Sequence, residues 1–236
     1  MNSERQKYKM HGGDIYNVSK ELNKDYKEVY DFSANINPLG LSKEVKVSII
    51  ENVDKLIHYP DRYAHGLKEL IAKKYDISKD AIVVGNGAEE LMYRLIYTYK
   101  RRIRALIPIP TFMAYEESLS FDKDNIIENY KTDLDTGIRE DILGYIHKEL
   151  DLMYLCLPNN PTGALTDEDI LSDIIKKTSE LNVRLVLDIS FMEFVEKSKQ
   201  IDVYKYAKSF DNIILINSFT KIHAIPGLRL GILYTE

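Results

Sequence analysis

The sequence predicts an α/β protein with a mostly parallel central sheet flanked by helices. Two observations support this class: short β-rich apolar runs alternate with longer amphipathic segments, and several runs are apolar at nearly every position. The runs at 185–187 (Leu-Val-Leu) and 213–216 (Ile-Ile-Leu-Ile) are typical of strands in a sheet that is covered on both faces. Regular alternation of strands and helices then favours parallel strands joined by helical crossovers.

The individual elements follow from the apolar patterns. Thr166 and the three acidic residues after it precede an apolar helical pattern, which marks a helix start. Short apolar runs bounded by turn residues predict strands at 81–84, 104–109, 125–130, 152–157, 183–188, 213–218 and 228–234. Apolar residues at helical spacing predict helices at 43–53, 67–75, 88–99, 112–120, 138–148, 167–181 and 203–209.

Composition narrows the class of protein further. The 236 residues, 44% of them hydrophobic, suffice for one large core or two small ones. With 32 basic and 37 acidic residues, the net charge of −5 gives no general reason to bind nucleic acid. The N-terminal residues lack the apolar stretch of a signal peptide, and no run reaches the roughly 20 residues of a membrane helix. We therefore expect a soluble cytoplasmic protein without membrane or nucleic-acid partners.

Cysteine use excludes two further kinds of site. Cys156 is the only cysteine and lies in the apolar run LMYLCLP. A single cysteine cannot form an intrachain disulfide or a metal cluster built on thiolates. We expect Cys156 to be a buried strand thiol.

The loops after the predicted strands are the places to look for a ligand, because parallel sheets bind ligands beyond the carboxyl ends of their strands. The first is VVGNGAEE, residues 83–90. Gly85 and Gly87 allow close backbone approach, and Ala88 can open a helix whose free amides and dipole favour an anion. Taken alone, such a glycine turn is more often only a turn.

Two further loops offer contacts to a planar, oxygen-bearing ring. Phe112 follows a predicted strand and could stack on a ring, although a core phenylalanine is the more common role. The loop LPNNPTG at 157–163 holds Asn160 between two prolines. Its amide can donate to a phenolate-like oxygen, and a plain turn is the alternative.

The last two loops carry charged groups at the ends of apolar strands. Burying Asp188 costs several kcal/mol unless it is paired, so either a cationic partner or a helix-capping role is expected. Lys221 follows a buried strand, where burial would lower its pKa and free the amine as a nucleophile. Ser218, Thr220 and Arg229 nearby suit a phosphate. An ordinary surface lysine is the alternative for Lys221.

Pyridoxal phosphate is one cofactor that would use all five loops together. Lys221 would form the Schiff base, and Asp188 would keep the pyridine nitrogen protonated. Asn160 would donate to the ring phenolate, and Phe112 would lie against the ring. The phosphate would be held by the backbone amides of Gly87, Ala88 and Glu89 and by the side chains of Ser218, Thr220 and Arg229.

These motifs resemble those of fold-type I pyridoxal-phosphate enzymes of the aminotransferase class I/II group. GNGAEE, PNNPTG, the strand ending at Asp188 and SFTK…GLRLG occur in the family order along nearly the whole chain. A narrower resemblance rests on HGGDIY at 11–16, DFSANINPLG at 31–40, YPD at 59–61 and AIPGLRLG at 224–231. These stretches are similar to threonine-phosphate decarboxylases. Those decarboxylases act in cobalamin synthesis and are related to histidinol-phosphate aminotransferases.

The resemblance implies a division of the chain and a set of partners. Residues 1–40 would form an N-terminal arm and substrate-side segment, and residues 41–236 the large cofactor-binding domain. His11, Gly12 and Asn35 would lie on the side of a phosphorylated amino acid substrate, with His11 near the substrate phosphate. Tyr59 would reach the cofactor phosphate of the neighbouring subunit, which implies a homodimer.

The sequence departs from the family pattern in three places. Ile189 stands where the family usually has glutamate. Phe191 stands where many aminotransferases have a tyrosine that touches the ring oxygen. The decarboxylases resemble this chain in having phenylalanine at that position. Family members continue for roughly another hundred residues into a small C-terminal domain with substrate-binding arginines, which the resemblance implies is absent here.

Three functions therefore stay open on the sequence. The first is decarboxylation of L-threonine O-3-phosphate to (R)-1-aminopropan-2-yl phosphate. The second is an aminotransferase reaction on histidinol phosphate or a similar amino acid. The third is a truncated cofactor-binding fragment without turnover.

Overall fold

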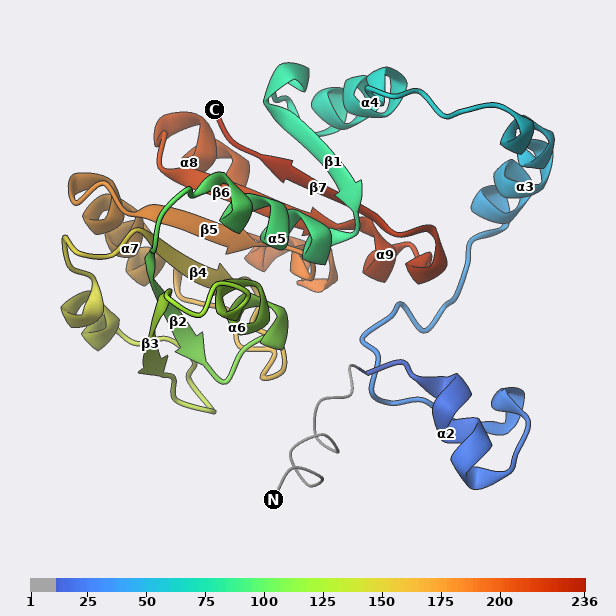
Figure 1. Ribbon diagram of the computed structural model, residues 1–236, viewed down its shortest axis with the longest axis horizontal. Helices are drawn as coiled ribbons and strands as arrows, with labels where there is room; N and C mark the ends of the chain where they lie inside the picture. Colours follow the sequence, from blue (N-terminus) through green and yellow to red (C-terminus); the bar gives the residue numbers. More distant parts are fainter. Residues whose placement is uncertain (1–11) are drawn as a thin grey trace.

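A seven-stranded mixed sheet forms the centre of the protein in the computed structural model, which describes residues 12–236 (Figure 1). Four neighbouring strand pairs are parallel, whereas β7 runs antiparallel to both β1 and β6. The predicted mostly parallel α/β class is therefore confirmed. In spatial order the strands are β1 (Ile82–Asn86), β7 (Leu230–Tyr234), β6 (Ile213–Ser218), β5 (Arg184–Asp188), β4 (Leu152–Cys156), β2 (Arg104–Ile109) and β3 (Ile126–Lys131).

Helices cover both faces of the sheet, with α5 and α6 on one face and α4, α7 and α8 on the other (Figure 1). Within residues 12–236, no helix has the length and apolar character needed to cross a membrane. The helices are α2 (Ile15–Leu22), α3 (Lys43–Glu51), α4 (His65–Tyr75), α5 (Ala88–Thr98), α6 (Met113–Ser120), α7 (Glu168–Glu180), α8 (Val203–Ser209) and α9 (Phe219–Ile222).

Apolar strands supply the core on both faces. Successive side chains of a strand point to opposite faces. In β5, Leu185 and Leu187 therefore join the cluster under α7 and α8, whereas Val186 joins the cluster under α5 and α6. All three side chains are fully buried. This double burial explains why the strand is apolar at successive positions instead of alternating with polar residues.

The helix predicted at 138–148 is wrong. The structure has a 3₁₀ helix, η4 (Glu140–Tyr145), at this place. Its hydrogen bonds span three residues, from the Ile142 amide to the Arg139 carbonyl and from the Ile146 amide to the Leu143 carbonyl. Gly144 lies inside the segment, and a glycine in a helix interior loses more backbone entropy on folding than other residues.

Two helices were not predicted from the sequence. The helix α2 begins after Asp14, whose carboxylate caps the amide of Asn17. The one-turn helix α9 follows β6 and carries Lys221. A single turn is too short to show an apolar period, so the sequence placed Lys221 only in a loop.

The N-terminal segment returns to the sheet at α9, although Figure 1 shows α2 and α3 lying away from the sheet. The Asn37 amide donates to the carbonyl of Lys221 at 3.0 Å, and its side-chain Nδ2 donates to the carbonyl of Ile222 at 2.8 Å. Gly12 packs against Ser33, because a Cβ at Gly12 would lie 1.9 Å from the Ser33 carbonyl oxygen. These contacts bring the arm to the carboxyl ends of the central strands.

A close backbone approach joins β7 to the loop between β1 and α5. A Cβ at Gly231 would lie 2.5 Å from the carbonyl carbon of Gly87 and 2.6 Å from the nitrogen of Ala88. Because only glycine lacks a Cβ, Gly231 allows the backbone of the loop between β1 and α5 to pack directly against β7. The loop that opens α5 is thus placed by a residue far from it in the sequence.

We expect Gly231→Ala to lower the free energy of unfolding by about 1–3 kcal/mol, since the added methyl group overlaps backbone atoms that cannot swing aside. Denaturant titration followed by circular dichroism measures the change. Gly227→Ala is the matched control, because nothing lies within 4 Å of its added carbon. Equal losses in the two variants would contradict the close approach.

Candidate cofactor site

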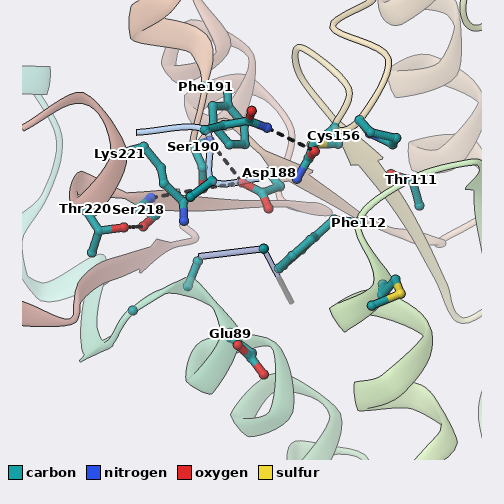
Figure 2. Close-up of a pocket in the computed structure, with 18 of the residues that line it drawn as sticks. Glu89, Thr111, Phe112, Cys156, Asp188, Ser190, Phe191, Ser218, Thr220 and Lys221 are labelled. Carbon is teal, nitrogen blue, oxygen red and sulfur yellow. Dashed lines mark hydrogen bonds between the residues drawn. The ribbon is translucent and has the colours of Figure 1, made fainter. Parts of the chain in front are cut away.

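A cavity of about 370 Å³ opens at the carboxyl ends of the central strands (Figure 2). This volume is within the usual range for small-molecule sites. Tyr59 is fully exposed and does not line the cavity of its own chain. His11 lies outside the described residues. The other predicted site residues all line the cavity, namely Gly12, Asn35, Gly87, Ala88, Glu89, Phe112, Asn160, Asp188, Ser218, Thr220, Lys221 and Arg229.

Asp188 ends β5 and is 4% exposed. Its Oδ1 accepts hydrogen bonds from the Ser190 amide at 3.0 Å and the Ser190 hydroxyl at 2.6 Å. Its Oδ2 accepts one from the Tyr115 hydroxyl at 2.8 Å. Burial raises the pKa of Asp188, while these hydrogen bonds and the nearby charge of Lys221 act to lower it. The carboxylate is therefore held in place by donors while facing the cavity.

Lys221 faces the same cavity from α9, beside Asp188 in Figure 2. Burial lowers the pKa of its amine, and the positive charge of Arg229 lowers it further. The carboxylates of Asp188 and Glu89 oppose this shift. A larger fraction of the amine is consequently neutral, and able to act as a nucleophile, than in an exposed lysine.

An anion cradle forms one side of the cavity. Gly87, with φ of +88°, precedes α5, so the free amides of the first helical turn face this region. The Arg229 guanidinium lies so close that a Cβ at Gly87 would be 2.9 Å from Nη2. The hydroxyls of Ser218 and Thr220 lie 2.7 Å apart and complete the cradle. These donors and the guanidinium fit a phosphate group.

The asparagine loop also lines the cavity, through Asn160 and Pro161. The Asn35 side-chain nitrogen donates to Oδ1 of Asn160 at 3.4 Å, which leaves the Asn160 nitrogen available to donate elsewhere. The neighbouring Asn159 holds the loop, donating to the Pro110 carbonyl at 3.0 Å and accepting from the Thr111 hydroxyl at 2.8 Å. Asn160 is thus presented by a loop with several internal hydrogen bonds.

The structure brings three residues to the site that the sequence did not single out: Tyr115, Ser190 and Asn37. Tyr115 follows Phe112 by three residues, a spacing that puts both rings on one side of a helix start. Ser190 follows Asp188 by two residues, which is the spacing of an Asx-type turn. Nothing local marks Asn37, because its partners are the distant carbonyls of Lys221 and Ile222.

Cys156 also lines the cavity. It is buried, as predicted. Burial and the charge of Asp188 raise the pKa of the thiol to about 12, so it stays protonated near neutral pH.

The sequence matches one family of proteins over most of its length. The model described as "Aminotransferase class I and II" matches residues 27–236. The chain belongs to the aminotransferase class I and II family. Members of this family depend on pyridoxal phosphate, which confirms the predicted cofactor.

Individual relatives in this family include enzymes of both predicted kinds. The chain is 34% identical to the threonine-phosphate decarboxylase of Salmonella typhimurium, over 94% of this chain and 61% of that protein. It is 30% identical to histidinol-phosphate aminotransferase 2 of Carboxydothermus hydrogenoformans, over 93% of this chain and 60% of that protein. The chain thus spans about 60% of the length of these curated relatives.

Solved structures give the same result. The crystal structure of L-threonine-O-3-phosphate decarboxylase from Porphyromonas gingivalis superposes with a TM-score of 0.76 at 28% identity. The match covers 87% of this chain and 59% of that one. The family match and the fold therefore agree over most of this chain.

The residues of the cavity fit pyridoxal phosphate. The cradle of Gly87, Ser218, Thr220 and Arg229 suits its phosphate, and the buried Asp188 carboxylate suits a protonated ring nitrogen. Lys221 supplies an amine with a lowered pKa.

We expect borohydride reduction in the presence of pyridoxal phosphate to link the cofactor covalently to Lys221 alone. Lys221→Ala should abolish this labelling. Peptide mass spectrometry locates the modified residue. Because the pKa of Lys221 is lowered from 10.5, labelling should reach half its maximum at a pH below that value. Lys176→Ala, on the exposed side of α7, is the control and should react normally. A reduced adduct on another lysine in Lys221→Ala would refute the assignment.

Proposed function

We propose that the protein catalyses pyridoxal-phosphate-dependent decarboxylation of L-threonine O-3-phosphate to (R)-1-aminopropan-2-yl phosphate, a step of cobalamin synthesis. The observation that carries this proposal is a shared cavity. The Lys221 amine and the Asp188 carboxylate open onto one space that also holds the anion cradle. A nucleophilic amine, a ring-nitrogen partner and a phosphate site are the groups this cofactor needs.

Each group has a distinct task in the proposed reaction. When bound, the cofactor supplies an electron sink for a bond broken at the substrate Cα. Asp188 keeps a proton on the ring nitrogen, which increases this electron demand. Lys221 would hold the cofactor through Nζ, and its amine is placed to deliver a proton to the substrate Cα. The bond between Cα and the carboxylate breaks, carbon dioxide leaves and the proton takes its place.

The side chain of Phe191 favours decarboxylation over amino transfer. Phe191 lines the cavity, at the position where the family resemblance puts a tyrosine in many aminotransferases. A phenylalanine offers no hydroxyl to the ring oxygen, which leaves Asn160 as the amide donor at that side. The higher identity to the Salmonella decarboxylase than to the Carboxydothermus aminotransferase, 34% against 30%, also supports this choice.

The substrate side and the assembly complete the proposal. Gly12 and Asn35 line the cavity from the N-terminal segment, where the phosphorylated substrate would bind, with His11 near its phosphate. The protein would act as a homodimer in which Tyr59 reaches the cofactor phosphate of the neighbouring subunit. Tyr59 is 100% exposed in the single chain, which leaves its hydroxyl available for that contact.

Amino transfer is the second candidate, supported by the 30% identity to a histidinol-phosphate aminotransferase over 93% of this chain. It would use the same cofactor groups, with Lys221 moving the Cα proton. A third candidate is that this chain binds the cofactor without turnover, which would use the same cofactor groups in the cavity.

Incubation with pyridoxal phosphate and L-threonine O-3-phosphate should release carbon dioxide in an amount equal to the substrate consumed, because the carboxylate is the group lost. Trapped carbon dioxide and the amine product are measured together. Lys221→Ala is the control and should release none. If a keto acid forms instead and the cofactor is converted to its amine form, the reaction is amino transfer and the proposed decarboxylation is refuted. A visible band of bound cofactor without either product would favour cofactor binding without turnover.

A further inference from the structure

We propose that Tyr115 is a positioning residue for the cofactor ring, on the basis of the proposed function. Its hydroxyl holds Oδ2 of Asp188 so that the carboxylate presents its remaining acceptor position to the ring nitrogen. The role is assigned to the hydroxyl of Tyr115 and not to the bulk of its ring.

The hydrogen bonds already made by the Asp188 carboxylate determine how many further hydrogen bonds it can accept. An ionised carboxylate has about four acceptor positions. Among residues 12–236, Ser190 fills two on Oδ1 with its amide and hydroxyl, and Tyr115 fills one on Oδ2 at 2.8 Å. One position on Oδ2 is left for a donor in the cavity that Asp188 lines. A single ring N–H matches this position.

The Tyr115 ring is held rigidly enough to aim its hydroxyl. Tyr115 is 0% exposed and stacks on Tyr154, with ring centroids 4.7 Å apart and an angle of 10° between the planes. The Tyr115 ring also meets Phe112 edge to face, with centroids 5.7 Å apart and an angle of 85° between the planes. Phe112 itself lines the cavity. Tyr115 therefore contacts both Phe112 and Asp188, the two residues that would meet the face and the nitrogen of the cofactor ring.

Charge and burial keep the Tyr115 hydroxyl a donor. Burial and the negative charge of Asp188 raise the pKa of Tyr115 well above its usual value, so the phenol stays protonated. Its hydrogen bond in turn lowers the pKa of Asp188, against the effect of burial. An ionised carboxylate favours a protonated ring nitrogen more strongly than a neutral acid does.

The alternative role for Tyr115 is core filling alone. A phenylalanine would occupy the same space between Tyr154 and Phe112 without burying a hydroxyl. Burying a hydroxyl costs free energy unless it is hydrogen-bonded. The Tyr115 hydroxyl meets this cost by bonding to the carboxylate at the site, which a purely structural role does not require.

The test compares Tyr115→Phe with Tyr154→Phe in the whole chain. Each substitution removes one buried phenol oxygen from the same ring stack, but within residues 12–236 Asp188 accepts a hydrogen bond from the Tyr115 hydroxyl and none from that of Tyr154. We expect Tyr115→Phe to weaken binding of pyridoxal phosphate by about tenfold, the loss of one hydrogen bond to a charged group. Tyr154→Phe should bind it like the wild type. Equilibrium titration of the visible absorbance measures both.

A spectroscopic signature separates positioning from stability. In Tyr115→Phe the pH at which the absorbance of the lysine-linked cofactor changes should move upward, because a less firmly protonated ring nitrogen draws fewer electrons from that link. Tyr154→Phe should keep the wild-type midpoint. In an Asp188→Asn background, Tyr115→Phe should have no further effect on either quantity, since both changes act through the same oxygen.

The outcomes distinguish this inference from the proposed reaction. Wild-type affinity and pH midpoint in Tyr115→Phe would overturn the role of Tyr115, whatever product the enzyme forms. Equal losses in Tyr115→Phe and Tyr154→Phe would also overturn it, in favour of core filling. Absence of carbon dioxide release from a wild-type chain that binds the cofactor would refute the decarboxylation and leave the binding result standing.

Discussion

The buried carboxylate of Asp188 is the interaction on which the organisation of the site depends. A charge at the end of an apolar strand costs free energy unless donors or a cation meet it. Ser190 supplies two hydrogen bonds from the turn after β5, and Tyr115 supplies one from the first turn of α6. The packing of α6 on the sheet therefore serves the carboxylate as well as the core, because Tyr115 belongs to both.

The order of the strands brings the other groups to this carboxylate. β4, β5 and β6 are parallel, so the asparagine loop, Asp188 and Lys221 follow strands that end at the same edge. The antiparallel β7 carries Gly231 back to the loop at Gly87, and Arg229, just before β7, lies against Gly87 as well. One reversed strand thus lets a late segment of the chain complete an anion cradle begun by an early one.

The N-terminal segment reaches the cofactor side through backbone and amide contacts. Asn37 bonds to the carbonyls of the helix that carries Lys221, and Asn35 bonds to Asn160. A substrate group bound along this segment would therefore lie at a position set by the same elements that place the cofactor.

The sequence by itself determined the fold class, every strand and most of the helices, because apolar periodicity reflects burial on one or both faces. It also pointed to the cavity residues that follow strands, since their chemistry is local to each motif. It failed at 138–148, where the structure has a 3₁₀ helix that contains Gly144, and at the single turn around Lys221. Only the tertiary structure decided that Tyr115 meets Asp188, that Asn37 holds α9 and that Gly231 lies against Gly87. These contacts join residues far apart in the chain, so their partners exist only after the strands have taken their order.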